Sequence, residues 1–208
     1  MPTAKPTREE RRAETRERLL NAAEQVFAER GYHAASVDEV AEKAGFSTGA
    51  LYSNFEGKED LFLALFERQV TLQAARVAAS VADQPSIAER ARSGAAEWVE
   101  YLQREPQTMM LYIEFWAYAV RNPEVRERYA QRYARVRDVT TAMIVRGAEE
   151  FGVELALPAE QLAMAVDAYA DGFALQKLAD PEGIPDDLLA RGLLMLFAGA
   201  ARPAPVEG

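Results

Sequence analysis

Apolar residues recur along this chain at the intervals typical of α-helices. They stand three or four positions apart from Leu19 to Phe27 and again from Val37 to Ala44, which places them on one face of a helix. No convincing segment alternates polar and apolar positions in the way that a half-buried strand does. The pattern therefore predicts an all-α protein.

Breaks in this pattern predict about nine helices. Thr7 to Glu10 and Ser36 to Glu39 have the spacing of capping boxes, which start helices. Gly31 and Gly45 follow the last apolar positions of these two helices and are expected to end them. The predicted helices span about 7–31, 36–45, 47–54, 58–82, 86–105, 109–121, 123–151, 158–179 and 186–199.

The length of the chain allows a small domain joined to a larger one. We expect a small N-terminal domain at 1–57 and a larger helical C-terminal domain at 58–201. Residues 202–208 are expected to form a disordered tail. Hydrophobic residues make up 49% of the chain and charged residues 27%, a balance that allows a substantial buried core.

Composition excludes several classes of function. The chain has no cysteine and one histidine, so the common nucleophile and base arrangements of enzymes cannot be assembled. We therefore expect no catalytic residue, no metal site and no cofactor. No window approaches the roughly 18 apolar residues of a membrane-spanning helix, and the absence of cysteine fits a reducing cytoplasm. We expect a cytoplasmic protein.

The net charge of −9 argues against a broad nucleic-acid-binding surface. The acidic excess lies mostly after residue 58, whereas the first eighteen residues are locally basic. Charge therefore permits a local DNA contact without arguing for one.

Residues 36–58 have the spacing of a helix-turn-helix. Ala41 is small where two helices must approach, and Gly45 can adopt the positive φ that a tight turn requires. Leu51 is expected to point into a small core with Val40 and Phe46. The same offsets also suit a helical hairpin inside a bundle, so the spacing alone leaves both interpretations open.

The second helix of this motif begins with side chains suited to DNA. Ser47 is placed to cap it, which leaves backbone N–H groups and a hydroxyl for a phosphate. Thr48 and Gly49 are small enough to let the backbone approach base edges. Lys58 starts a helix, where the dipole disfavours a cation, so we interpret it as a phosphate contact. The end of the motif adds two possible phosphate donors, Tyr52 and Asn54.

The run from Ser36 to Phe55, followed by Lys58 and Leu61, resembles the signature of TetR-type transcriptional regulators. Asn54 is a departure, since many members have histidine there. The resemblance implies a repressor that binds a palindromic DNA operator as a homodimer. It assigns phosphate contacts to Ser36, Ser47, Tyr52 and Lys58, base contacts to Thr48 and Gly49, and either arm contacts or a solvated face to Arg8, Arg11 and Arg12. The alternatives are an activator or a helical interaction scaffold that does not bind DNA.

The C-terminal part is rich in aromatic residues and methionine, which suit either a helical core or the wall of a small-molecule effector site. Glu114 and Asp171 lie in apolar runs and are either anchors for a cationic ligand or structural. Residues 170–176 resemble a subgroup pattern whose relatives sense small metabolites or choline-like compounds. The candidate effector residues are Trp98, Tyr101, Met110, Glu114, Trp116, Tyr118, Tyr133, Met143, Tyr169 and Phe173.

The last two predicted helices carry more apolar positions than one core requires, which predicts a four-helix dimer interface. We assign to it Leu162, Val166, Leu189, Gly192, Leu193 and Leu196, with Gly192 permitting close approach. The helix at 58–82 would be about 37 Å long. It is expected to link the DNA contact at Lys58 to the effector site.

Overall fold

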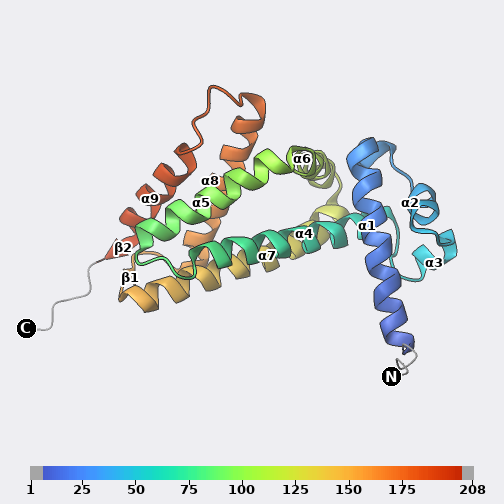
Figure 1. The fold of residues 1–208 in the computed structure, drawn as a ribbon, viewed down its shortest axis with the longest axis horizontal. Helices are drawn as coiled ribbons and strands as arrows, with labels where there is room; N and C mark the ends of the chain where they lie inside the picture. Colours follow the sequence, from blue (N-terminus) through green and yellow to red (C-terminus); the bar gives the residue numbers. More distant parts are fainter. Residues whose placement is uncertain (1–6, 203–208) are drawn as a thin grey trace, which may run out of the picture. The chain divides into compact units, whose positions relative to one another are not determined.

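The computed structural model describes residues 7–202, which form nine α-helices and two short strands (Figure 1). All nine predicted helices are present, so the all-α prediction is confirmed. The helices are α1 (Arg8–Ala34), α2 (Val37–Ala44), α3 (Thr48–Tyr52), α4 (Lys58–Val81), α5 (Ile87–Arg104), α6 (Pro106–Arg121), α7 (Pro123–Phe151), α8 (Ala159–Ala179) and α9 (Leu188–Ala200). The predicted tail at 202–208 lies outside the described residues except for Arg202.

The two strands are an addition to the sequence-based prediction. Strand β1 (Glu154–Leu155) pairs antiparallel with β2 (Ala201–Arg202), with Leu155 opposite Ala201. Each strand has only two residues, so neither is long enough to show an alternating pattern. The pair joins the segment after α7 to the end of α9.

Helix boundaries follow local chemistry. Thr7 and Ser36 form complete capping boxes with Glu10 and Glu39, as predicted. Gly45 ends α2 in the left-handed conformation with φ +74°. Pro106, which we expected to lie before a helix, is instead the first residue of α6. Proline is tolerated there because the first N–H groups of a helix have no partner within it.

The chain folds as two compact units. The first unit comprises Met1–Gln69 and Met110–Tyr129, and the second comprises Val70–Met109 and Ala130–Gly208. Helices α4, α6 and α7 therefore each contribute residues to both units.

The first unit has two groups of buried side chains. In the helix-turn-helix, Val40 and Leu51 are fully buried, as predicted, and Ala41 lets α2 approach its neighbours. The other group is aromatic: Phe62 stacks on Phe115 with ring centroids 4.1 Å apart, and Phe27 meets Phe62 edge-on. Each fully buried leucine or phenylalanine stabilises the fold by roughly 1.5–3 kcal/mol.

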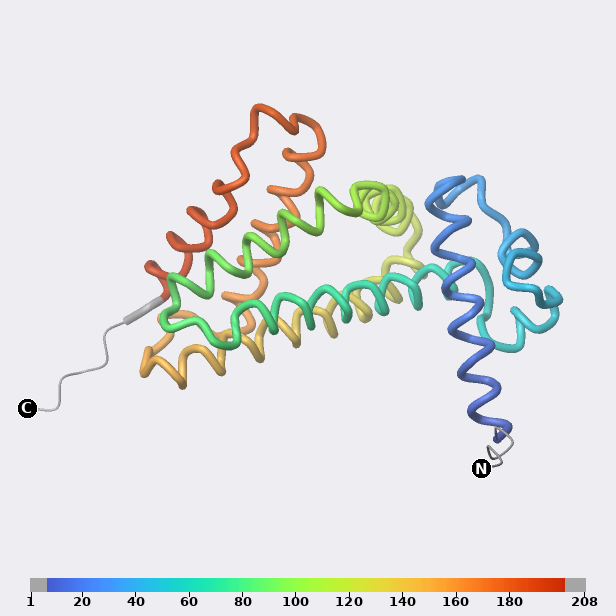
Figure 2. Tube along the Cα trace, in the orientation of Figure 1, coloured from blue at the N-terminus to red at the C-terminus, as the bar shows by residue number. Residues whose placement is uncertain are grey.

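In the second unit, α5 packs along α9, and α9 packs on α8. Figure 2 shows the course of the chain through these helices. Small residues of α5, Ala91 and Ala95, are buried together with Leu189 and Leu193 of α9. Lys177 holds the connection between α8 and α9, because its ammonium donates to the carbonyls of Pro181 and Ile184 and pairs with Asp186.

Gly192 makes room for an aromatic ring of the same chain. A Cβ at this position would lie 2.1 Å from Cζ of Tyr169, whose hydroxyl donates to the carbonyl of Leu188 at 2.9 Å. The close approach that we assigned to a second copy of the chain is therefore used within one protomer.

Replacing Gly192 by alanine should lower the free energy of unfolding by about 1–3 kcal/mol, because the ring of Tyr169 must move out of a tightly packed position. Urea unfolding measures the change. Gly199→Ala in the same helix is the matched control, since a Cβ there meets nothing within 4 Å. That variant should be as stable as the original protein or slightly more stable. Equal stability of the two variants would contradict this account of Gly192.

Candidate DNA-binding and effector sites

The start of α3 presents a polar surface. Ser47 is the N-cap residue, and its hydroxyl accepts the N–H of Ala50 at 3.2 Å. Ser47 and Gly49 are exposed, and Tyr52 is 55% exposed although it is a large aromatic residue. These three predicted DNA-binding residues therefore lie on the surface at one short helix, which α2 and the buried Leu51 hold in place.

The remaining predicted DNA-binding residues of the motif also have partners within the fold. Ser36 caps α2 through the N–H of Glu39. The hydroxyl of Thr48 donates to Asp38 at 2.7 Å, which orients this side chain across the two helices. The amide of Asn54 donates to the carbonyl of Ala50 at 2.8 Å and is thereby turned toward its own helix.

Lys58 has local partners that the sequence argument did not anticipate. Its ammonium donates to the carbonyl of His33 at 2.9 Å and lies 4.7 Å from the ring centroid of Tyr32. Burial lowers its pKa. The interpretation that nothing within the fold explains a cation at this helix start was therefore wrong. Its contact with a DNA phosphate stays a prediction.

Two arginines that we did not assign hold the helix-turn-helix against α1. The guanidinium of Arg16 lies 4.3 Å from the ring centroid of Phe55 and donates to the carbonyl of Asn54. Arg18 lies 4.6 Å from the ring of Phe46 and donates to the carbonyl of Ala44. Helical periodicity could not reveal these contacts, because the partners lie far apart in sequence.

Glu114 stabilises the turn near the end of α1. Gly31 has φ +73° and ψ 171°, which interrupts the helix there. The two carboxylate oxygens of Glu114 accept the N–H groups of Tyr32 and His33, each at 3.1 Å. We expected Glu114 to be either an anchor for a cationic ligand or a structural residue, and these contacts give it a structural role.

The ten candidate effector residues belong to both units. Met110, Glu114, Trp116 and Tyr118 lie in the first unit, and the other six lie in the second. Met110 and Trp116 are about half exposed. In the second unit Trp98 packs on Tyr101, Tyr169 packs on α9 and Phe173 is buried, whereas Tyr133 and Met143 of α7 are half-buried.

A polar cluster joins α7 to α8 in the second unit. The hydroxyl of Thr140 donates to Asp167 at 3.0 Å, and the hydroxyl of Tyr133 donates to Asp171. Burial raises the pKa of Asp167 to about 6, against the opposing hydrogen bond from Thr140, and the negative charge of Asp171 raises it further. Burial raises the pKa of Asp171 as well, so both acidic groups are held in a setting that favours their neutral forms.

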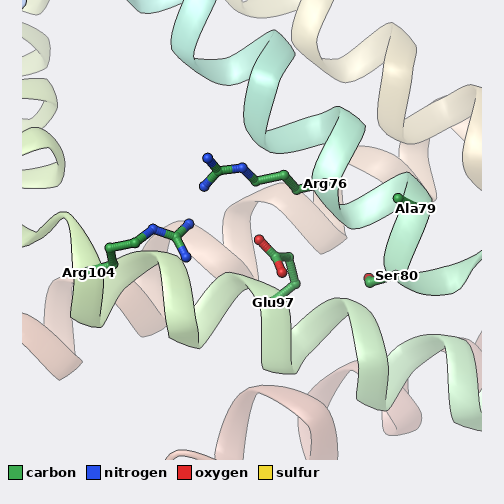
Figure 3. Close-up of a pocket in the computed structure, with 5 residues that line it drawn as sticks. All are labelled: Arg76, Ala79, Ser80, Glu97 and Arg104. Atoms are coloured by element: carbon green, nitrogen blue, oxygen red, sulfur yellow. The ribbon is translucent and has the colours of Figure 1, made fainter.

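A groove of about 610 Å³ lies between α4 and α5, also in the second unit (Figure 3). Arg76, Ala79 and Ser80 line it from α4, and Glu97 and Arg104 line it from α5. None of these residues was among the candidates. Charged side chains on amphipathic helices look like solvent-facing positions in a sequence, so no sequence signal separates them from an ordinary surface.

The predicted dimer residues divide by burial. Leu162, Leu189 and Leu193 are buried within the protomer itself, whereas Val166 and Leu196 are half-buried. The largest exposed apolar side chains of α8 and α9 are Met164, Leu175 and Met195, the last of them 77% exposed.

Residues 7–202 contain neither a cluster of possible metal ligands nor a helix suited to span a membrane. No three histidine, aspartate or glutamate side chains of this part gather where they could hold a metal ion. None of its helices combines the length and the apolar character needed to cross a membrane.

Two family profiles match the chain. The profile of bacterial regulatory proteins of the tetR family matches residues 19–65, which include the helix-turn-helix. The profile of the C-terminal domain of BetI-type transcriptional repressors matches residues 85–195. The second match alone covers more than half of the chain.

Individual proteins are similar over different shares of the chain. The transcriptional activator FasR of Mycolicibacterium smegmatis is 35% identical over 50% of this chain and 47% of its own length. The repressor AcnR of Corynebacterium efficiens is 27% identical over 84% of this chain and 88% of its own. A regulator from Saccharomonospora viridis, solved in complex with choline, is 25% identical with a TM-score of 0.62, over 92% of this chain and 100% of its own.

Replacing Glu114 by glutamine should destabilise the protein by about 1–3 kcal/mol, because the amide group turns a donor toward one of the two backbone N–H groups. Urea unfolding reports the change. Glu127→Gln, an exposed position on α7, is the control and should be close to neutral. A neutral effect at both positions would show that Glu114 does not stabilise the turn.

Replacing Asp167 by asparagine should stabilise the protein at pH 7.5. The carboxyl has a pKa of about 4 in the unfolded chain and of about 6 in the folded protein. Its ionisation therefore lowers the stability of the folded protein as the pH rises from about 4 to about 6. Asparagine stays neutral and can still accept from Thr140. The gain should shrink at pH 5 and disappear below about pH 4. Asp138→Asn, at an exposed position on α7, is the control in urea unfolding; an equal gain at all pH values would contradict the assignment.

Proposed function

Because the chain belongs to the tetR family of bacterial regulatory proteins, with a C-terminal domain of the BetI type, we propose that it is a homodimeric repressor of a palindromic operator. A small molecule bound by the C-terminal part releases it from DNA. The family consists of transcriptional regulators rather than enzymes, and the helix-turn-helix binds DNA. The proposed site of action is the cytoplasm.

The exposed start of α3 carries this proposal. Ser47 offers a hydroxyl for a phosphate, and the first N–H groups of a helix, which have no partner within it, can donate to the same phosphate. Gly49 has no side chain to keep the backbone from a base edge, and Tyr52 can donate to a second phosphate. The acidic net charge then confines affinity to these few contacts and to the basic start of α1.

Repression is favoured over activation by the breadth of the similarity. The BetI-type repressor profile and AcnR both match across the C-terminal part. The activator FasR matches over only half of this chain. Since a regulator's response depends on its C-terminal part, the matches that cover that part carry more weight.

The proposed dimer uses the exposed apolar side chains of α8 and α9. Met164 and Leu175 are about half exposed and Met195 is 77% exposed within one protomer, and a second copy would cover these side chains. A twofold dimer explains a palindromic operator, because two recognition helices about 34–36 Å apart, or a multiple of that, enter successive major grooves.

The proposed response to a small molecule depends on α4. This helix starts at Lys58 in the first unit and ends at Val81 in the second, where it lines the groove with α5. A ligand that shifts α4 would therefore act on both units. A coupling free energy of about 1–3 kcal/mol would change operator affinity about 5–150-fold. The choline complex of the Saccharomonospora viridis regulator supports a small-molecule effector in this architecture.

Replacing Gly49 by leucine should weaken specific operator binding about 5–150-fold, the range expected for loss of a base contact. A Cβ at Gly49 meets only the Ser47 hydroxyl at 3.8 Å, so a larger side chain fits the fold but projects toward DNA. Gel shift with DNA flanking the gene, or with sites selected from a random pool, measures the affinity.

Ala142→Leu is the matched control, since it adds a similar side chain to an exposed position on α7. It should retain full operator affinity. Both variants should elute as dimers in size-exclusion chromatography. Operator affinity of Gly49→Leu equal to that of the original protein would refute this role of α3.

A further inference from the structure

The groove between α4 and α5 brings together charged groups of both signs, with positive charge in excess. The guanidinium groups of Arg76 and Arg104 and the carboxylate of Glu97 extend from opposite helices into the same space (Figure 3). Ser80 adds a hydroxyl from α4, although this hydroxyl donates to the carbonyl of Val77 at 2.8 Å and so offers mainly its acceptor side.

Two of the three charged side chains have no ionic partner among residues 7–202. Neither Arg76 nor Glu97 forms an ion pair or hydrogen bond there, although they line the same groove. Arg104 pairs only with Glu100, one turn earlier on its own helix, at 3.2 Å. Two guanidinium groups that face a common space repel each other, and an anion placed between them would remove that repulsion.

Two buried polar side chains without hydrogen-bond partners lie close in sequence to groove-lining residues. Gln73 is only 5% exposed, and neither its amide oxygen nor its amide nitrogen has a hydrogen-bond partner. It lies one turn before Arg76 on the same face of α4. The indole N–H of Trp98, next to Glu97 on α5, is likewise buried without an acceptor. Buried polar groups are ordinarily hydrogen-bonded, so ordered water is expected beside both positions, although neither residue lines the groove itself.

We infer that this groove binds a small molecule through an anionic group, a carboxylate or a phosphate, held between Arg76 and Arg104. The guanidinium fork matches the oxygen spacing of both anions. Glu97 accepts a hydrogen bond from a hydroxyl or amine group on the same molecule. The volume of about 610 Å³ suits a metabolite rather than a single inorganic ion. The identification of the bound molecule as the effector rests on the proposed function. The prediction that it carries an anionic group does not.

Three probes that share one ring separate the possible chemistries. Benzoate carries a carboxylate, phenyl phosphate carries a phosphate, and phenyltrimethylammonium carries a positive charge. Calorimetric titration of the full chain at constant ionic strength should show binding of benzoate or phenyl phosphate and not of the cation. The anion that binds more tightly shows whether the groove prefers a carboxylate or a phosphate. Binding of the cation alone, or of no probe, would overturn the inference.

Variants then locate the binding. Arg76→Gln and Arg104→Gln should each weaken binding of the anion about tenfold or more, since each removes a charge-assisted hydrogen bond. Arg92→Gln is the matched control, because Arg92 is exposed on α5 and pairs only with Glu89. Unchanged affinity in both groove variants would overturn the assignment.

One groove variant is expected to bind the anions more tightly, which a misfolded protein would not do. Glu97→Gln removes the carboxylate that lines the groove and repels an anion there, so it should strengthen binding of benzoate and phenyl phosphate severalfold. Weaker binding in this variant would contradict the arrangement.

Gel shift keeps the two proposals apart. If the groove holds an anion but the chain binds no specific DNA, the proposed function fails and the site stands. If the chain binds an operator but the groove variants titrate like the original protein, the site fails and the proposed function stands.

Discussion

The carboxylate of Glu114 stabilises the turn near the end of the first helix from a position more than eighty residues away. It accepts the N–H groups of Tyr32 and His33, which the turn at Gly31 would otherwise leave without partners. This turn places the ring of Tyr32 edge-on against Phe115, with centroids 4.8 Å apart. The first unit is therefore assembled from two separate stretches of the chain through one acidic side chain and the aromatic cluster beneath it.

The position of Lys58 depends on the same turn. The carbonyl of His33 and the ring of Tyr32 hold its ammonium, and both belong to the residues that Glu114 fixes. A cation at the start of α4 is thus stabilised by the end of α1. The N-terminal helices and residues 110–129 consequently form one compact unit, although a division of the chain at residue 57 separates them.

Local chemistry made much of the DNA-binding part predictable. Capping boxes at Thr7 and Ser36, the left-handed Gly45 and the buried Leu51 depend on neighbours within a few residues, so each could be expected from the sequence. The contacts of Arg16, Glu114 and Lys58 join residues far apart in sequence, and helical periodicity carries no information about such pairs.

The residues of the proposed effector site were harder to predict from the sequence, for a different reason. Tyrosine, tryptophan and methionine suit both cores and ligand pockets, so their abundance did not decide which of them face a cavity. The groove between α4 and α5 is instead lined largely by charged side chains, which in a sequence match the outer face of an amphipathic helix. Only the fold shows that Arg76 and Arg104 lie opposite each other.

The contact between Tyr169 and Gly192 also constrains how this family branch can diverge. The ring occupies the space that any side chain at 192 would need, and its hydroxyl reaches the backbone of Leu188 one turn earlier. A larger residue at 192 is expected to leave the stability of the fold unchanged only together with a smaller one at 169. The two positions are therefore expected to covary among relatives. In a relative with alanine at 192, we expect a residue other than tyrosine at 169, and so a different contact between α8 and α9.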